Sequence, residues 1–282
     1  MFSSRVAKTC SRLVPPGRFC LGRLGGRYSS TSDQVTPLYN EHIKRGATMA
    51  SFADWTLPML FNESHIVSHH HTRKNASVFD VCHMQQIVIK GDSRHDFMDR
   101  ICVADTRELK ENQMTYSLLT NENGGIIDDC MITNFKDYIY LVVNAGCATK
   151  DLKHLNKQVQ DFAGTKLHAT SDRGLIALQG PEAKNVLQRG VHDLNLDEVG
   201  FLSAREVDVH GYPCIVNRCG YTGEDGFEIS VAEKNTADLW NKFLEEPHVL
   251  PAGLAVRDSL RLEAGVHCSF FLNLFVVGRS NS

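Results

Sequence analysis

The sequence predicts an α+β fold, in which some strands pair as hairpins and others alternate with helices. Two glycine-rich turns indicate the hairpins, one at Asn121 to Gly125 and one at Gly220 to Gly226. Segments with apolar residues three and four positions apart indicate the amphipathic helices between them. Because strands occur in hairpins as well as around helices, this class is favoured over a parallel doubly wound sheet.

Short strands and amphipathic helices follow one another along the chain. Strands are expected at Gln86 to Lys90, Tyr138 to Val143, Leu175 to Gln179 and Phe227 to Val231. Helices are expected in a segment that Asp92 or Ser93 caps and that carries Phe97, Ile101 and Val103, at Lys150 to Phe162, from Pro181 to about Arg189, and around Trp240, Phe243 and Leu244.

Composition describes an ordinary globular chain of 282 residues, 42% hydrophobic and 22% charged, with room for two domains. The net charge of -3 implies no attraction to polyanions, so we expect no nucleic-acid partner. No apolar run approaches the roughly 20 residues of a membrane span, so none is expected. The nine cysteines form no CxxC pair, and we interpret them mostly as buried thiols.

The first 33 residues have the composition of a mitochondrial transit peptide. They are rich in arginine and serine, and no acid precedes Asp33. The alternative is a basic tail for nucleic acid, which the acidic balance of the remaining chain disfavours. We therefore expect the protein in the mitochondrial matrix.

Two acidic motifs are candidates for chemistry. Asp128 and Asp129 follow the Asn-Gly-Gly turn inside a strand, so only one of them can point inward. An inward carboxylate without a cation is costly and therefore a functional candidate, although a pair of acids that blunts an edge strand is an equal alternative. The second motif, with Glu224, Asp225 and Glu228 near Tyr221, suits a polar planar ligand or is a hairpin with a solvated acidic tip.

A dense histidine cluster has spacing that can bind zinc, because two of its members lie one helical turn apart. The cluster comprises His65, His69, His70 and His71. No third ligand is identifiable, so we expect a solvated or partner-facing helix and no metal.

Eight motifs resemble the T-protein family of aminomethyltransferases, together with the wider folate-binding family around it. They are TPLY (Thr36 to Tyr39), FADWTLP (Phe52 to Pro58), HTRKNASVFDVCHM (His71 to Met84), NENGGIIDD (Asn121 to Asp129), VVNAGC (Val142 to Cys147), ALQGP (Ala177 to Pro181), RCGYTGEDGFEIS (Arg218 to Ser230) and AGLAVRDSLRLEAG (Ala252 to Gly265). They occur in the family's order and spacing.

The resemblance implies a folate-binding fold of the GcvT type. It places a discontinuous first domain at residues 34–85 and 170–265, with an inserted ferredoxin-like domain at 86–169. Folate would bind at the centre between them.

The resemblance also implies the reaction and its participants. An aminomethyl group on the lipoyl arm of the glycine cleavage H-protein would pass its methylene to tetrahydrofolate, and ammonia would leave. The P- and L-proteins would be the other members of the system, and no metal would take part. A related branch acts in iron–sulfur cluster maturation, but it carries the signature KGCYxGQE where this chain has GYTGEDGFE.

The resemblance also implies roles for individual residues, according to their positions in the matching motifs. Asp129 matches the family's catalytic aspartate, which would stabilise positive charge on the transferred carbon. Glu228 matches the glutamate that binds the pterin donor edge, and Arg257 matches an arginine on the same ligand, unless it pairs on the helix surface with Glu263 or another acid. Tyr221 and Tyr116 match ring contacts or pack in the core, and Asn144 is a pocket candidate or simply a turn residue.

The sequence departs from the family after Gly265. Residues 266–282 match nothing in it and include an almost wholly apolar run, Phe270 to Val277. We expect a C-terminal truncation in which the family's β-barrel domain is absent. An aminomethyltransferase weakened in this way is therefore one hypothesis, and a fragment that only binds folate or H-protein is the alternative.

Overall fold

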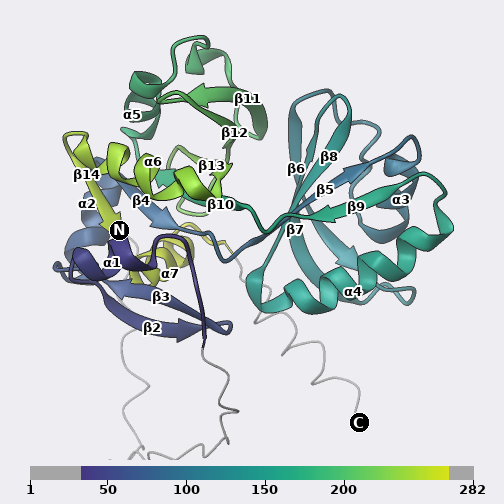
Figure 1. The fold of residues 1–282 in the computed structure, drawn as a ribbon, viewed down its shortest axis with the longest axis horizontal. Coiled ribbons are helices and arrows are strands. Elements are labelled where there is room, and N and C mark those ends of the chain that lie inside the picture. Colours follow the sequence, from purple (N-terminus) through teal and green to yellow (C-terminus); the bar gives the residue numbers. More distant parts are fainter. Residues whose placement is uncertain (1–32, 267–282) are drawn as a thin grey trace, which may run out of the picture. The chain divides into compact units, whose positions relative to one another are not determined.

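The computed structural model describes residues 33–266, which form two sheets covered by helices (Figure 1). The strands are β1 (Gln34–Val35), β2 (Thr48–Phe52), β3 (Trp55–Leu60), β4 (Ala76–Asp80), β5 (Gln85–Lys90), β6 (Gln113–Thr120), β7 (Ile126–Asn134), β8 (Tyr138–Val143), β9 (Lys166–Ala169), β10 (Arg173–Gln179), β11 (Ser203–Val209), β12 (Tyr212–Arg218), β13 (Gly226–Ala232) and β14 (Val249–Ala252). The α-helices are α1 (Tyr39–Lys44), α2 (His65–Lys74), α3 (Arg94–Ile101), α4 (Ala148–Gln158), α5 (Ala183–Gly190), α6 (Glu233–Glu245) and α7 (Leu254–Glu263), and three 3-10 turns are η1 (Ala145–Cys147), η2 (Val159–Asp161) and η3 (Leu196–Glu198).

The larger sheet has the strand order β14-β4-β10-β13-β12-β11-β6-β7-β8-β5-β9. Between its two halves the β-ladder consists of one residue pair, Ser203 of β11 opposite Gln113 of β6. Within each half most neighbours are antiparallel, whereas β14 runs parallel to β4. A smaller sheet has the order β1-β3-β2. Hairpins and helix-linked strands therefore coexist, and the predicted α+β class is confirmed.

The half formed by β5 to β9 carries α3 and α4 on one face (Figure 1, blue to teal). Phe97 of α3 and Leu155 of α4 are fully buried there against Ile87 and Ile139 of the sheet. These strands and helices are contiguous in sequence. The boundaries expected at residues 86 and 169 stay a prediction.

The other half buries α5 and α6 against β10, β12 and β13. Leu187 of α5 and Trp240 and Phe243 of α6 are fully buried in this core. At roughly 1.5–3 kcal/mol for each large apolar side chain buried, this packing stabilises the two helices against the sheet.

A third apolar cluster combines the remaining faces of both halves with α7. It contains Met114 and Tyr140 from one half, Ala177 and Ile215 from the other, and Val256 of α7. We call it the shared cluster. Side chains around it come from strands far apart in sequence, so it is the place where residues of both halves can meet.

Most predicted elements are confirmed, with three corrections at helix ends. The helix with Phe97 and Ile101 ends at Ile101, and Val103 beyond it is 67% exposed. The helix after Pro181 begins at Ala183, because Pro181 lies in a turn closed by the bond from Ala183 N–H to Gly180 O. The helix expected to reach Phe162 becomes 3-10 at Val159 and stops at Asp161.

The predicted transit peptide lies outside the described residues, apart from Asp33, and so does the divergent tail beyond Val266. Within residues 33–266 the cysteines are free thiols and all but Cys82 are buried. In the same range no helix combines the length and apolarity needed to cross a membrane.

Candidate active site

The glycine-rich loop between β12 and β13 is built around one buried amide, that of Gln179. Its Nε2 donates to Cys219 O at 3.0 Å, and its Oε1 accepts from Thr222 Oγ1 at 2.9 Å. A Cβ on Gly220 or Gly226 would lie 2.0 or 2.3 Å from this side chain. The two glycines are therefore required by close approach, which explains the sequence pattern of the turn.

The acidic residues at the loop tip are held by arginines. Asp225 accepts from Arg218 at 2.7 Å, and Glu224 accepts from Arg73 of α2 at 3.0 Å. Arg73 also donates to Thr222 O at 2.5 Å and pairs with Glu263 of α7 at 2.6 Å. The hairpin is confirmed, but its tip is not simply solvated, because these ion pairs attach the loop to α2 and α7.

Glu228, Tyr221 and Arg257 form one group of predicted site residues. The guanidinium carbon of Arg257 lies 3.7 Å from the centroid of the Tyr221 ring. Burial raises the pKa of Glu228, while the positive charge of Arg257 and a hydrogen bond from the Cys219 thiol act against this rise. Glu263 pairs with Arg73 and His69, so the described residues do not show the alternative in which Arg257 pairs with Glu263.

This group has unused hydrogen-bonding capacity. Tyr221 Oη and Arg257 Nη1 are buried and have no hydrogen-bond partner among residues 33–266. Burial raises the pKa of Tyr221 to about 12, so its hydroxyl remains a donor. Two buried donors beside the Glu228 carboxylate are an arrangement that a planar polar ligand would satisfy.

Asp129, Asn144 and Tyr116 form a second group, on the half containing β5 to β9. Asn144 directly follows β8, whose last residue Val143 is paired with Cys130, and so it lies opposite Asp129. Its Nδ2 donates to Asp129 Oδ1 at 2.8 Å. The pKa of Tyr116 is raised to about 12 by burial and by the Asp129 carboxylate beside it. Tyr116 is nevertheless 52% exposed and is not a core residue.

The two acids of the pair differ as the strand geometry requires. Asp128 is fully buried, whereas Asp129 is half-buried on the opposite face of β7. Met131 is on the same face as Asp129, and it packs against the shared cluster that contains Tyr221. Both groups of predicted residues therefore border the same apolar cluster.

Three buried groups that the sequence reasoning missed lie close to these residues. His83, whose pKa burial and the charge of Arg257 lower to about 4, is neutral at physiological pH. Asp80 accepts from Thr36 at 2.6 Å and pairs with His42 at 2.8 Å. Asp151 is fully buried in the first turn of α4. The burial of Asp151, although not its contact with Asp128, could have been predicted, since it is aligned with Leu155 on the apolar side of its helix.

The histidine cluster on α2 makes protein contacts. His69 has Ser259 Oγ 2.8 Å from Nδ1 and Glu263 2.9 Å from Nε2. His71 Nε2 donates to His248 O at 2.9 Å. Both side chains fix α2 against neighbouring segments.

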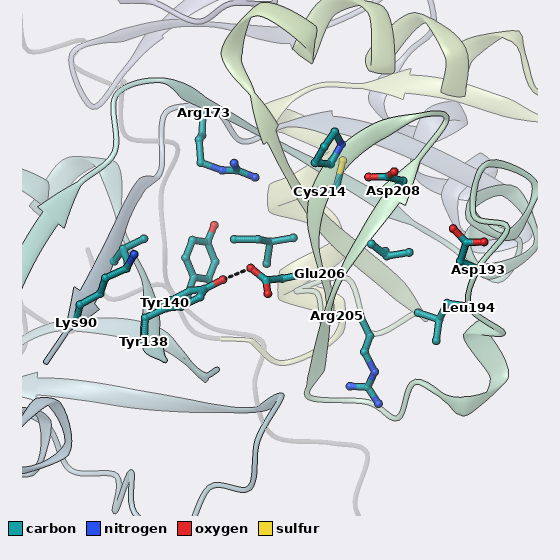
Figure 2. Close-up of a pocket in the computed structure, with 14 residues that line it drawn as sticks. Lys90, Tyr138, Tyr140, Arg173, Asp193, Leu194, Arg205, Glu206, Asp208 and Cys214 are labelled. Carbon is teal, nitrogen blue, oxygen red and sulfur yellow. Dashed lines mark hydrogen bonds between the residues drawn. The ribbon is translucent and has the colours of Figure 1, made fainter. Parts of the chain in front are cut away.

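A separate cavity of about 730 Å³ opens beside β5, β8, β11 and β12 (Figure 2). Tyr138 Oη donates to Glu206 at 2.6 Å across it, and Arg173 projects from β10. None of the six predicted site residues is among the described residues that line it. Arg173 does donate to Ser230, two residues from Glu228, so the cavity adjoins the strand of the candidate site.

The family model of the GCVT N-terminal domain matches residues 38–269. The chain belongs to this family. Among curated relatives it is 46% identical to the mitochondrial aminomethyltransferase of Homo sapiens, over 82% of this chain and 58% of that protein. It is 43% identical to the Dictyostelium discoideum enzyme of the same name, over 85% of this chain and 63% of that protein.

A solved structure of a family member has the same fold. The glycine cleavage system aminomethyltransferase T from Bartonella henselae is 38% identical, with a TM-score of 0.78 over 83% of this chain and 63% of that one. This likeness confirms the predicted GcvT-type fold. The chain thus spans about three fifths of the length of the family members it matches.

Proposed function

We propose that this chain carries the aminomethyl-transfer site of glycine cleavage. The methylene of an aminomethyl group on the lipoyl arm of the H-protein would pass to tetrahydrofolate, with release of ammonia, in the mitochondrial matrix. The P- and L-proteins would complete the system. The observation that carries the proposal is the Asp129 carboxylate, held at 2.8 Å by the amide of Asn144 beside the shared cluster.

The Glu228 group fits the pterin ring of tetrahydrofolate. A pterin presents both N–H donors and acceptors in one plane, and the group offers a carboxylate beside two buried donors, Tyr221 Oη and Arg257 Nη1. Glu228 would accept from the donor edge of the ring. Arg257, stacked on Tyr221, would hold the same ligand.

Tetrahydrofolate supplies the nitrogen that accepts the one-carbon unit. The chain supplies an oriented negative charge, because Asn144 restrains the Asp129 carboxylate before the substrate arrives. Such a charge stabilises positive charge that develops at the transferred carbon, and it can hold a proton close to the leaving ammonia. Tyr116, half exposed beside Asp129, would contact the substrate from the same face.

Ammonia release from aminomethyl-loaded H-protein with tetrahydrofolate tests this function. Asp129→Asn should lower the rate by about 100-fold or more, the scale seen when a charge-stabilising group is removed. Tetrahydrofolate affinity should change little, because Asp129 is not in the Glu228 group. The matched control is Asp137→Asn, an exposed acid in the β7–β8 turn. An unchanged rate in Asp129→Asn would overturn the assignment.

A second candidate function is binding of folate or H-protein without catalysis. It is motivated by the Glu228 group, whose buried donors Tyr221 Oη and Arg257 Nη1 suit a planar ligand without any contribution from Asp129. The same assay separates the two functions. Tetrahydrofolate binding with no ammonia release above an enzyme-free control would favour the second.

A further inference from the structure

Behind the Asp129–Asn144 pair lies a buried group that the proposed reaction does not use. Asp128, Cys147 and Asp151 each place one oxygen or sulfur atom within 4.8 Å of the others, and all three residues are buried. They come from β7, from η1 and from the first turn of α4. Two carboxylates this close cannot both be ionised away from water without a large cost, so either a proton or a cation must lie between them.

The hydrogen bonds around the two carboxyl groups favour one of them as the carrier of the proton. Asp128 accepts from the backbone N–H of Asn144 at 3.1 Å and from Asn144 Nδ2 at 3.2 Å. Neither oxygen of Asp151 accepts a hydrogen bond from any of the described residues. An ionised carboxylate can only accept hydrogen bonds and therefore needs donors around it, whereas a protonated carboxyl group has an O–H that can donate. These contacts favour Asp151 as the protonated member of the pair and Asp128 as the acceptor of its proton, since the two carboxyl groups lie within 4.8 Å of each other.

A proton explains the group better than a metal ion does. Without a metal ion, burial and the nearby Asp128 charge raise the pKa of the Cys147 thiol to about 12, so the thiol stays protonated beside the two carboxyl groups. The Nζ of Lys150 already brings a positive charge close by, where it donates to Ile127 O at 2.5 Å. The remaining two carboxylates are too few ligands for a closed divalent site.

We propose that Asp151 is a positioning residue, whose proton holds Asp128 against Asn144 and so fixes the amide that orients Asp129. The Asn144 amide has two hydrogens, and its Nδ2 lies 2.8 Å from Asp129 Oδ1 and 3.2 Å from Asp128 Oδ1. One amide thus spans both carboxylates. If Asp151 lost its proton, repulsion would displace Asp128, and Asn144 would follow it. This role of Asp151 rests on the proposed function of Asp129.

The pH dependence follows from the charges that face Asp151. Burial and the Asp128 charge raise its pKa to about 8, Lys150 lowers it, and Asp129 raises it further. The Cys130 thiol also faces the group, and burial raises its pKa well above the usual value, so it stays neutral. Asp151 is therefore the group that changes charge, and the arrangement should hold below about pH 8 and fail above it.

Asp151→Asn is the decisive variant, because an asparagine N–H can donate to Asp128 and never ionises. In the full chain, ammonia release should fall through about pH 8, whereas Asp151→Asn should keep the rate measured at pH 7 and lose this alkaline fall. Asp151→Ala should lose most of the rate at every pH. Asp137→Asn should keep the alkaline fall. An Asp151→Asn variant as impaired as Asp151→Ala, or one that keeps the fall, would overturn the proposal.

Two readouts do not need turnover. The side-chain amide signals of Asn144 in ¹⁵N spectra, assigned by their loss in Asn144→Ala, should move through about pH 8 in the parent chain and stay fixed in Asp151→Asn. The infrared band of a protonated carboxyl should vanish in Asp151→Asn and persist in Asp137→Asn. If these changes occur without ammonia release, the proposed function fails and the shared proton stands. A band that instead disappears when Zn²⁺ or Mg²⁺ is added would show a cation site and overturn the shared proton.

Discussion

Arg257 lies over the ring of Tyr221 with its guanidinium carbon 3.7 Å from the ring centroid. A planar guanidinium stacks on an aromatic face and still presents its N–H groups at the edge, which an ammonium cannot do. Tyr221 is itself supported edge-on by Phe79, with ring centroids 6.0 Å apart. The pair therefore presents donors in a fixed orientation next to Glu228.

Arg257→Lys should weaken tetrahydrofolate binding while leaving the fold intact. The lysine keeps the charge but loses the stacked plane and its edge donors, a loss of about 1–2 kcal/mol, or roughly 5- to 30-fold in Kd. Isothermal titration calorimetry measures the affinity, and thermal unfolding checks the fold. Arg261→Lys on the same helix is the control, since Arg261 pairs with Asp258. Equal affinity in the two variants would show that the stack does not bind the ligand.

Glu228→Gln should lose tetrahydrofolate binding and gain stability at neutral pH. Because the folded protein raises the pKa of Glu228, it binds more protons than the unfolded chain between the ordinary pKa of 4.5 and the raised pKa. The free energy of unfolding therefore falls as pH rises through this window. Glutamine removes the ionisation, so the advantage of the variant should be larger at pH 7 than at pH 4.5.

Urea unfolding at the two pH values measures this difference, and calorimetry measures the binding. Glu108→Gln, at an exposed position, should change neither quantity. A variant that is less stable than the parent at pH 7 would contradict the assigned cost of ionised Glu228.

Asp80→Asn should be strongly destabilising. Burial alone would raise the pKa of Asp80, but hydrogen bonds from His42, Thr36 and the Cys82 N–H outweigh burial and lower it. Breaking such a buried pair costs about 3–5 kcal/mol, because the remaining partner keeps its desolvation penalty. The stabilisation is present above the ordinary pKa of 3.8 and is lost as pH falls through the lowered folded value.

Urea unfolding from neutral pH down to the acid range tests this. The parent chain should lose stability steeply in acid, and Asp80→Asn should show a shallower slope from a lower starting value. Asp137→Asn should follow the parent. If Asp80→Asn matched the parent at neutral pH, the pair with His42 would carry no stability.

Gly226→Ala should disrupt the loop that carries Tyr221. The added Cβ would lie 2.3 Å from Gln179 Nε2, so the amide that holds the loop must move. Overpacking of this kind costs about 1–3 kcal/mol. Gly200→Ala is the matched control, because a Cβ there meets nothing within 4 Å. Thermal unfolding compares the two, and an equal change in Tm would refute the close-approach argument.

Local chemistry in the sequence was enough to predict much of the fold. The strand Tyr138–Val143 has the predicted bounds, since a run of apolar residues can be buried on both faces. Helix ends were less predictable, because the chain leaves the helix at Cys102 to form a β-bridge with Leu119, and Val103 N–H then donates to Leu118 O. Such an exit is decided by a partner strand and not by local pattern.

Some residues of the candidate site could likewise be predicted from local sequence, whereas others depend on tertiary packing. Asp129 and Glu228 could be proposed from motifs, and strand alternation predicted that only one acid of the Asp128–Asp129 pair can face inward. The inward acid is Asp128, so the family motif and not the inward direction is what points to Asp129. Asp151 could not be identified as a partner of Asp128, since their contact depends on how α4 is packed against β7. The ion pairs of Arg73 with Glu224 and Glu263 also join residues far apart in the sequence, so they could not be predicted from local pattern.

Arg73 belongs to neither group of candidate site residues, yet it connects the loop that holds Tyr221 to the helix that holds Arg257. A ligand bound between that loop and that helix would therefore bind more weakly if Arg73 were lost, although Arg73 does not contact it. The effect of a substitution on α2 should thus depend on which of these ion pairs and hydrogen bonds it removes, and not on its distance from the bound molecule.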